Sequence, residues 1–227
     1  MRSTLKTGVF ILVISFLVIQ NKGFSSMLDS VAYVSKLDSL KAEYPKIRYD
    51  GPYSVSFYAA LNGFPELKNI SVQFRERSIK TTMQCRPKTF SVLRKPQKRK
   101  FLMVFNHNRG RSRGVPINKL SFNARVGLFA HELAHIVDYQ KMSGGEIFGL
   151  GIRYLFGKGK IELEHKIDRI VIWKGFGSQI FQYAKEVLKS NSISDDYRKR
   201  RQRVYLQPSE IKELVDIVEN MPANVKR

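Results

Sequence analysis

Cysteine is nearly absent from this sequence of 227 residues, which contains only Cys85. A chain with one cysteine cannot form an internal disulfide, so its hydrophobic core or a bound metal must hold the fold together. Internal repeats and low-complexity linkers are missing as well. Hydrophobic residues make up 43% of the chain and charged residues 26%, which is typical of a globular protein. We therefore predict a single folded domain over residues 26–227.

Long apolar runs are also missing, apart from one over residues 8–19. As a helix this run would cover about 18 Å, whereas the hydrocarbon core of a bilayer is about 30 Å thick. Arg2 and Lys6 precede the run, and this order is typical of a secretory signal peptide. We predict that residues 1–25 are a signal peptide cleaved near Ser25, with a retained anchor as the alternative. The protein would then be exported, and be periplasmic, extracellular or membrane-associated.

Acidic residues are scarce in the middle of the chain: residues 77–131 contain 14 lysines and arginines but no aspartate or glutamate. The formal charge of the whole chain is +21, and it falls to +18 without the three basic residues of the predicted signal peptide. Such an excess indicates attraction to an anionic membrane surface, a polysaccharide or a nucleic acid. The basic run Arg198–Arg203 has few aromatic neighbours, so we expect a solvated or membrane-facing patch there rather than a nucleic-acid site.

Hydrophobic periodicity predicts strands early in the chain and helices late. Alternation of apolar and polar residues predicts a strand over residues 70–77, and an apolar run predicts a buried strand over residues 101–106. The predicted helices cover residues 27–50, 54–62, 121–141, 161–174, 178–190 and 208–220. Gly144 and Gly145 are expected to end the third of these helices, and Gly175 the fourth. This order of elements predicts the α+β class.

The motif HELAH places His131 and His135 four residues apart in a predicted helix. On a helical wheel the two histidines lie about 40° apart, and the apolar residues of the helix gather on the opposite side. Neutral imidazoles at this spacing can bind one zinc ion. Glu132 would lie beside that ion, where it can accept a proton from metal-bound water. One face of this helix therefore predicts a metal site, and the other joins the core.

The third metal ligand is expected in the helix over residues 161–174, where Glu162, Glu164, His165 and Asp168 are the candidates. Glu164 and Asp168 share an apolar face of the helical wheel. Burying two carboxylates on such a face requires a cation or a hydrogen-bonding partner. Glu162 lies on the opposite side near basic residues, which predicts a surface position. We predict Glu164 as the third ligand, with His165 as the alternative.

The motif HELAH followed by EHKID resembles the gluzincin group of zinc metallopeptidases, whose pattern is HExxH on one helix and ExxxD on the next. The resemblance covers about 40 residues around the site. It implies a zincin-like fold, in which a small twisted sheet precedes the active-site helix and a mostly helical C-terminal part. It also implies one Zn²⁺ per chain bound by His131, His135 and Glu164, with Glu132 as the general base. Asp168 matches the aspartate that orients a ligating histidine.

We also make predictions for two features near the site, the strand before the helix and Asp138. The resemblance implies that the strand over residues 101–106 lies along the cleft and offers an edge to an extended peptide. The metzincin pattern is excluded, because Asp138 and Lys141 stand where it requires glycine and histidine. Asp138 is not part of the gluzincin pattern either. Two roles for it remain open: a group that supports a metal ligand, or an ion pair with Lys141.

Two features of the predicted site are not determined by the order of residues. The group that would stabilise a developing oxyanion has four candidates by type alone, which are His107, Tyr139, Arg153 and Tyr154. The apolar, glycine-rich stretch over residues 147–156 is interpreted as a core-packing connector, or as a mobile flap or membrane-touching loop in which Phe148 and Phe156 make the contact.

The function predicted from the sequence is that of an exported zinc-dependent metallopeptidase acting on a peptide or protein substrate. One alternative is a catalytically silent, zinc-stabilised domain that binds anionic envelope polymers or partner proteins. Another is a basic membrane- or nucleic-acid-binding protein in which HELAH is incidental.

Overall fold

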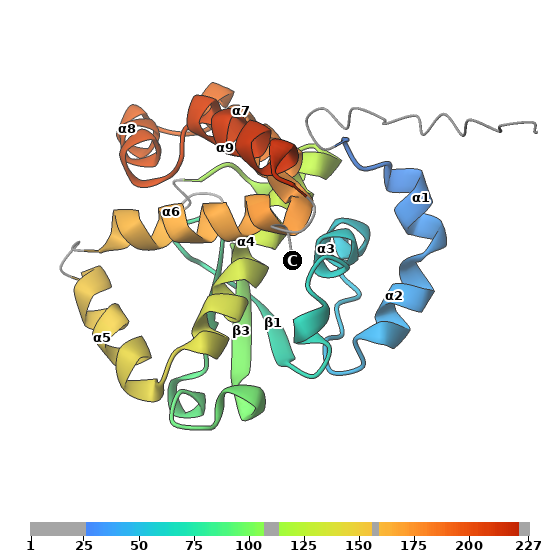
Figure 1. Cartoon of the computed structure of the whole chain (residues 1–227), viewed down its shortest axis with the longest axis vertical. Coiled ribbons are helices and arrows are strands. Elements are labelled where there is room, and N and C mark those ends of the chain that lie inside the picture. Colours follow the sequence, from blue (N-terminus) through green and yellow to red (C-terminus); the bar gives the residue numbers. More distant parts are fainter. Residues whose placement is uncertain (1–25, 107–113, 156–158, 223–227) are drawn as a thin grey trace, which may run out of the picture.

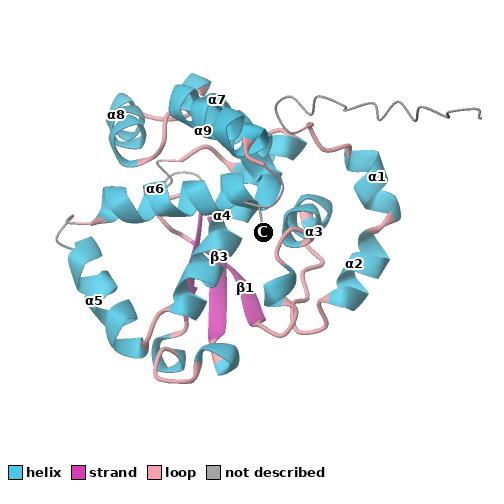
Figure 2. Ribbon diagram, in the orientation of Figure 1, coloured by secondary structure: helices cyan, strands magenta, loops and turns pink. Residues whose placement is uncertain are grey.

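The structure is a computed structural model that describes residues 26–106, 114–155 and 159–222. It has the predicted α+β class, with a small three-stranded sheet surrounded by helices (Figures 1 and 2). The predicted signal peptide lies outside the described residues. Within the described ranges, no helix has both the length and the apolar character that crossing a bilayer requires.

Short helices precede the sheet, and most of the helical residues follow it. The first group and the sheet comprise α1 (Ser30–Ser35), α2 (Leu37–Glu43), α3 (Ser54–Leu61), β1 (Ser71–Arg77), β2 (Met83–Pro87) and β3 (Lys100–Asn106). The second group comprises α4 (Phe122–Lys141), α5 (Gly144–Leu155), α6 (Lys160–Val171), α7 (Gly177–Lys189), α8 (Asp195–Val204) and α9 (Pro208–Asn220). The helix predicted over residues 27–50 is therefore two short helices that end at Glu43.

The strands are ordered β1-β3-β2, so β3 is the central strand of the sheet. It pairs in parallel with β1, where Phe101 lies opposite Val72, and antiparallel with β2, where Met103 lies opposite Cys85. The expectation that the strand over residues 101–106 offers a free edge is therefore wrong, because both of its sides are hydrogen-bonded. The strand at the edge next to α4 is β2.

Strand β2 is missing from the prediction for a physical reason. It has five residues, and its buried positions, Met83, Cys85 and Pro87, alternate with Gln84 and Arg86. Such a short run with a proline and a charged residue has no clear β signal, because strand propensity reflects packing against neighbours rather than the residues alone. The central strand β3 supplies those neighbours.

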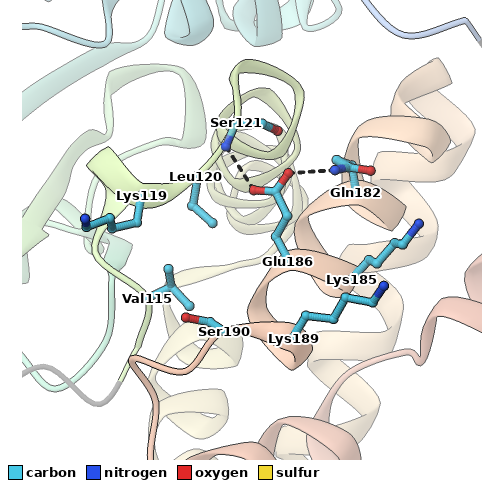
Figure 3. Close-up of a pocket in the computed structure, with 9 residues that line it drawn as sticks. All are labelled: Val115, Lys119, Leu120, Ser121, Gln182, Lys185, Glu186, Lys189 and Ser190. Carbon is cyan, nitrogen blue, oxygen red and sulfur yellow. Dashed lines mark hydrogen bonds between the residues drawn. The ribbon is translucent and has the colours of Figure 1, made fainter.

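Helix α4, which carries HELAH, is fixed at its start by two side chains. The Ser121 hydroxyl accepts a hydrogen bond from the Ala124 N–H at 3.2 Å, as an N-cap does. The Glu186 carboxylate of α7 accepts a hydrogen bond from the Ser121 N–H at 2.9 Å and another from the Gln182 side chain at 2.6 Å (Figure 3). The first turn of α4 is thereby attached to α7.

The buried face of α4 packs against the sheet and against α3 and α7. The Phe129 ring makes edge contacts with Phe57 and Phe105, at centroid distances of 5.4 and 6.0 Å. Gly127 allows α4 and α7 to approach closely, because a Cβ at this position would lie 2.2 Å from the carbonyl oxygen of Gln179. The position of the HELAH helix therefore depends on close packing on its far side.

The glycines expected to end α4 instead lie at the start of the next helix. Helix α4 ends at Lys141, and Gly144 and Gly145 are the first residues of α5. The Ser143 hydroxyl accepts a hydrogen bond from the Glu146 N–H at 3.2 Å, and the Glu146 carboxylate accepts one from the Ser143 N–H at 2.6 Å. These reciprocal bonds form a capping box, which starts a helix despite the two glycines. The stretch over residues 147–156 is therefore helical up to Leu155, and Phe156 lies outside the described residues.

Helix α6 ends earlier than predicted, at Val171. A π-helical turn, Ile172–Phe176, follows α6, and Gly175 adopts a left-handed conformation there (φ 86°), as a helix-ending glycine does.

The basic run Arg198–Arg203 lies in α8 and is partly buried. The Arg201 side chain is only 3% exposed, and its guanidinium carbon lies 3.8 Å from the ring centroid of Tyr205. The run is therefore not entirely a surface patch.

Candidate metal centre

Helices α4 and α6 bring two histidines and a glutamate together. His131 and His135 are one turn apart on α4, and Glu164 lies in the second turn of α6. The Glu164 Oε2 atom is 3.1 Å from His131 Nε2 and 3.7 Å from His135 Nε2. One ligand atom from each residue lies within 4.8 Å of the others. These three side chains lie close enough to hold a metal ion, and the site is largely shielded from solvent.

The orientation of the His131 ring is held by Asp168, which is completely buried. The Asp168 Oδ1 atom lies 2.8 Å from His131 Nδ1, and its Oδ2 atom accepts a hydrogen bond from the Leu206 N–H at 3.2 Å. A carboxylate at Nδ1 favours the tautomer that is protonated there, which leaves the Nε2 lone pair facing Glu164. Two acceptors facing each other require a proton or a cation between them.

The electrostatics of the cluster agree with a site for positive charge. Burial lowers the pKa of His131, but the hydrogen bonds to Asp168 and Glu164 and the charges of these carboxylates outweigh it and raise the pKa to about 10. Burial also raises the pKa of Glu164, but its hydrogen bond with His131 and its interaction with the nearby His135 outweigh burial and hold this pKa well below its usual range. Two imidazoles and a carboxylate are also a donor set that metal ions accept, so the residues fit a bound cation.

Glu132 lies next to this cluster without being part of it. Its side chain is buried and lines the same pocket as His131 and His135. Burial raises the pKa of Glu132, while the two histidines and a hydrogen bond from the Cys85 backbone N–H lower it in part. A carboxyl group whose pKa lies above its usual value can take up and return a proton more readily near neutral pH.

Three other residues considered from the sequence lie outside the cluster. Asp138 is buried and forms an ion pair with Lys166 of α6, with Oδ1 and Nζ 2.5 Å apart. This pair stands in place of the one considered with Lys141, and it joins α4 to α6. Glu162 is exposed, and His165 is half-buried and not among the three clustered ligands.

The cluster opens into a pocket of about 330 Å³ between β2, α4, α5 and α6. Residues from outside the two motifs that line it include Gln84, Cys85, Arg86, Ile147, Leu150, Leu163 and Tyr205. The wall formed by β2 and the contribution of Tyr205 were missed from the sequence. The Tyr205 ring centroid lies 5.8 Å from that of His131, although the two residues are far apart in the chain, so no local pattern points to it.

Of the four candidates for stabilising an oxyanion, the structure places Tyr139 in the pocket and Arg153 outside it. Tyr139 lines the pocket, and its ring stacks on His135 at a centroid distance of 6.2 Å. Burial keeps the pKa of Tyr139 well above its usual value, so its hydroxyl remains a proton donor. Arg153 is exposed on α5 and is not among the pocket-lining residues. His107 and the Tyr154 side chain lie outside what the structure describes.

Comparison of the chain with known protein families, curated proteins and solved structures gives no match. The resemblance to gluzincins therefore rests on the two sequence motifs, HELAH and EHKID.

Proposed function

We propose that the protein is an exported, zinc-dependent metallopeptidase of gluzincin type that hydrolyses peptide bonds. The observation that carries the proposal is the approach of His131, His135 and Glu164 to within 4.8 Å beside the buried Glu132. Two imidazoles and one glutamate are a ligand set of catalytic zinc sites, which keep one coordination position open. Export is supported by the order of charged and apolar residues over residues 1–25.

The side chains of the centre have complementary roles in this proposal. Zinc in the cluster would supply a Lewis acid that polarises the scissile carbonyl and lowers the pKa of a water molecule. Glu132 would accept the proton of that water and pass it to the leaving amine. Asp168 would keep the His131 ring in one tautomer and orientation through Nδ1. Tyr139 would donate a hydrogen bond to the developing negative charge.

Strand β2 is the proposed binding edge for an extended substrate. It lies at the end of the strand order, and Gln84, Cys85 and Arg86 line the pocket beside the cluster. A peptide added to an edge strand gains main-chain hydrogen bonds that do not depend on its sequence. This replaces the role that the resemblance implied for the strand over residues 101–106, which is the central strand of the sheet.

Metal content provides the first test. The purified protein is expected to bind one zinc ion per chain, measured by elemental analysis after dialysis, and His131→Ala or Glu164→Ala should abolish binding. His165→Ala is the matched control, because His165 is adjacent to Glu164 but outside the cluster, and it should retain the metal. A folded wild-type protein without metal would overturn the proposal.

Hydrolysis separates a peptidase from a domain that zinc only stabilises. Wild-type protein should cleave members of a mixed peptide library, and a chelator should stop the cleavage. Glu132→Gln should keep its zinc and lose activity by at least about 100-fold, the low end of what a general base contributes. Glu162→Gln, an exposed change of the same kind, should retain activity. Equal cleavage by wild type and Glu132→Gln would contradict the role of Glu132.

A further inference from the structure

Four large hydrophobic side chains are exposed on two segments of the chain that approach each other at Gly144 and Val92. Phe90 is 86% exposed, Leu93 85%, Phe148 70% and Ile152 42%. Phe90 and Leu93 lie on the turns between β2 and β3, and the other two lie on α5. Scattered single hydrophobic residues are normal on a protein surface, but a group of this size indicates an interaction. We call these four residues, with the basic residues around them, the docking face.

Contacts place the two segments that carry the docking face next to each other. A Cβ placed on Gly144, the first residue of α5, would lie 3.1 Å from the carbonyl oxygen of Val92. The Arg99 guanidinium donates hydrogen bonds to the carbonyl oxygens of Tyr139 (2.6 Å) and Met142 (2.7 Å), at the end of α4. The turns that carry Phe90 and Leu93 are therefore attached to the α4–α5 junction. In Figure 1 they lie at the bottom of the molecule, next to the lower end of α5.

Positive charge surrounds the exposed side chains. Arg94, Lys95 and Lys98 are all exposed on the same turns, and none of them forms an ion pair among the described residues. No acidic residue occurs anywhere in residues 77–131. Glu146 is the acid at the start of α5, and its carboxylate accepts a hydrogen bond from the Ser143 N–H. The docking face thus combines exposed apolar groups with exposed cationic side chains.

Helix α5 has two distinct faces. Phe148 and Ile152, one turn apart, are exposed, whereas Ile147 and Leu150 are buried and line the metal pocket. The same helix therefore forms a wall of the pocket and part of the docking face. A surface that held α5 from outside would lie next to the pocket.

We propose that the docking face binds an anionic lipid bilayer, with Phe90, Leu93 and Phe148 entering the interfacial region and Arg94, Lys95 and Lys98 contacting lipid phosphates. Charge alone would suit any polyanion. A hydrated polysaccharide or a nucleic acid, however, offers no apolar phase for protruding leucine and phenylalanine side chains, whereas a bilayer takes both kinds of group. The proposal concerns where the protein lies and does not depend on the chemistry of the pocket.

Tryptophan quenching at single positions of the full chain tests this proposal. The chain has one tryptophan, Trp173, so Trp173→Phe provides a background without indole fluorescence. In that background, Leu93→Trp should be quenched by vesicles of brominated phosphatidylglycerol and phosphatidylcholine, and not by brominated phosphatidylcholine alone. Val31→Trp is the control, because Val31 is 73% exposed on α1, at the other side of the molecule (Figure 1).

The two positions distinguish docking from attachment through residues 1–25. Val31 is close in sequence to that segment, so attachment through the segment alone would quench Val31→Trp at least as strongly as Leu93→Trp. Docking quenches Leu93→Trp more strongly. Equal quenching, stronger quenching at Val31, or no quenching at Leu93 would overturn the proposal.

Charge substitutions supply a second comparison with the same readout. Lys95→Gln with Lys98→Gln should weaken binding of the Leu93→Trp protein about fivefold per charge at low salt. Lys199→Gln with Lys212→Gln removes the same charge from exposed positions on α8 and α9 and should have a smaller effect. If both pairs weaken binding equally, the attraction is a property of the net charge and the proposed face is wrong.

Discussion

The two sides of the pocket at the candidate metal centre differ in how firmly they are packed. Helices α4 and α6, which carry the candidate ligands, each have a buried apolar face. They are joined by the His131–Asp168 contact and by the Asp138–Lys166 ion pair. Helix α5, on the other side, has glycine at four of its 12 positions. Each glycine inside a helix costs about 1 kcal/mol relative to alanine. The candidate ligands thus lie on two helices that are well packed, and a helix of lower intrinsic stability covers them.

In the proposed function, this contrast would combine fixed metal ligands with access for a substrate. A site that binds metal needs ligands held in position, and that requires packing and satisfied polar groups around them. Regions with few buried contacts open at a lower free energy than the core does. We therefore expect α5 to open locally while α4 and α6 stay in place.

The largest expected effect comes from Gly127→Ala on α4. The added Cβ would lie 2.2 Å from the Gln179 carbonyl oxygen, so the backbones of α4 and α7 must separate. Overpacking of this kind should lower the free energy of unfolding by about 3 kcal/mol, measured by urea denaturation. Unchanged stability would show that the packing behind HELAH is looser than described.

Asp168→Asn should have the next largest effect, on metal affinity. The amide keeps the size of the side chain but no longer provides a charged acceptor for His131 Nδ1. Losing such a partner of a ligating histidine weakens metal binding about 10- to 100-fold. A competition titration with a chelator measures the change, and Glu162→Gln serves as the control. Wild-type affinity in Asp168→Asn would contradict the orienting role.

Lys166→Met removes the ion pair between α4 and α6 while keeping most of the apolar stem of the lysine. The buried Asp138 carboxylate then loses the partner that lies 2.5 Å away. Because Lys166 is about half exposed, we expect a loss of only about 1 kcal/mol in the free energy of unfolding. Lys212→Met on α9 should leave stability unchanged. An equal loss in both variants would argue against a specific pair.

Gly149→Ala on α5 should have the smallest effect, and it should be stabilising. A Cβ at Gly149 would have no neighbouring atom within 4 Å, so the substitution brings helix propensity without a clash. Protection of the α5 amides from hydrogen exchange should rise about fivefold, which corresponds to about 1 kcal/mol, while global unfolding stays unchanged. If global stability rises by the same amount, α5 unfolds with the core and the contrast between the two sides is wrong.

Much of the site was predictable because its residues lie on two helices with strong local patterns. The spacing of His131 and His135 and the carboxylates on the apolar face of the next helix are properties of helical periodicity, which a sequence displays directly. The start of α4 was also predictable from its N-cap, Ser121, and its end at Lys141 agrees with the predicted range, although the glycines expected to end it begin α5. Helix α5 was missed because its glycines outweighed the capping box of Ser143 and Glu146, although that box is visible in the sequence.

The sequence alone thus determined the α+β class, the helix that carries HELAH and the candidate ligands. Tertiary structure alone decided that β2 rather than β3 forms the edge beside the pocket, that Asp138 pairs with Lys166, and that Tyr205 lies near His131. The physical reason is that periodicity and capping act within a few residues of the chain. Strand order and contacts between helices depend instead on packing between segments that are distant in sequence, and no local pattern encodes them.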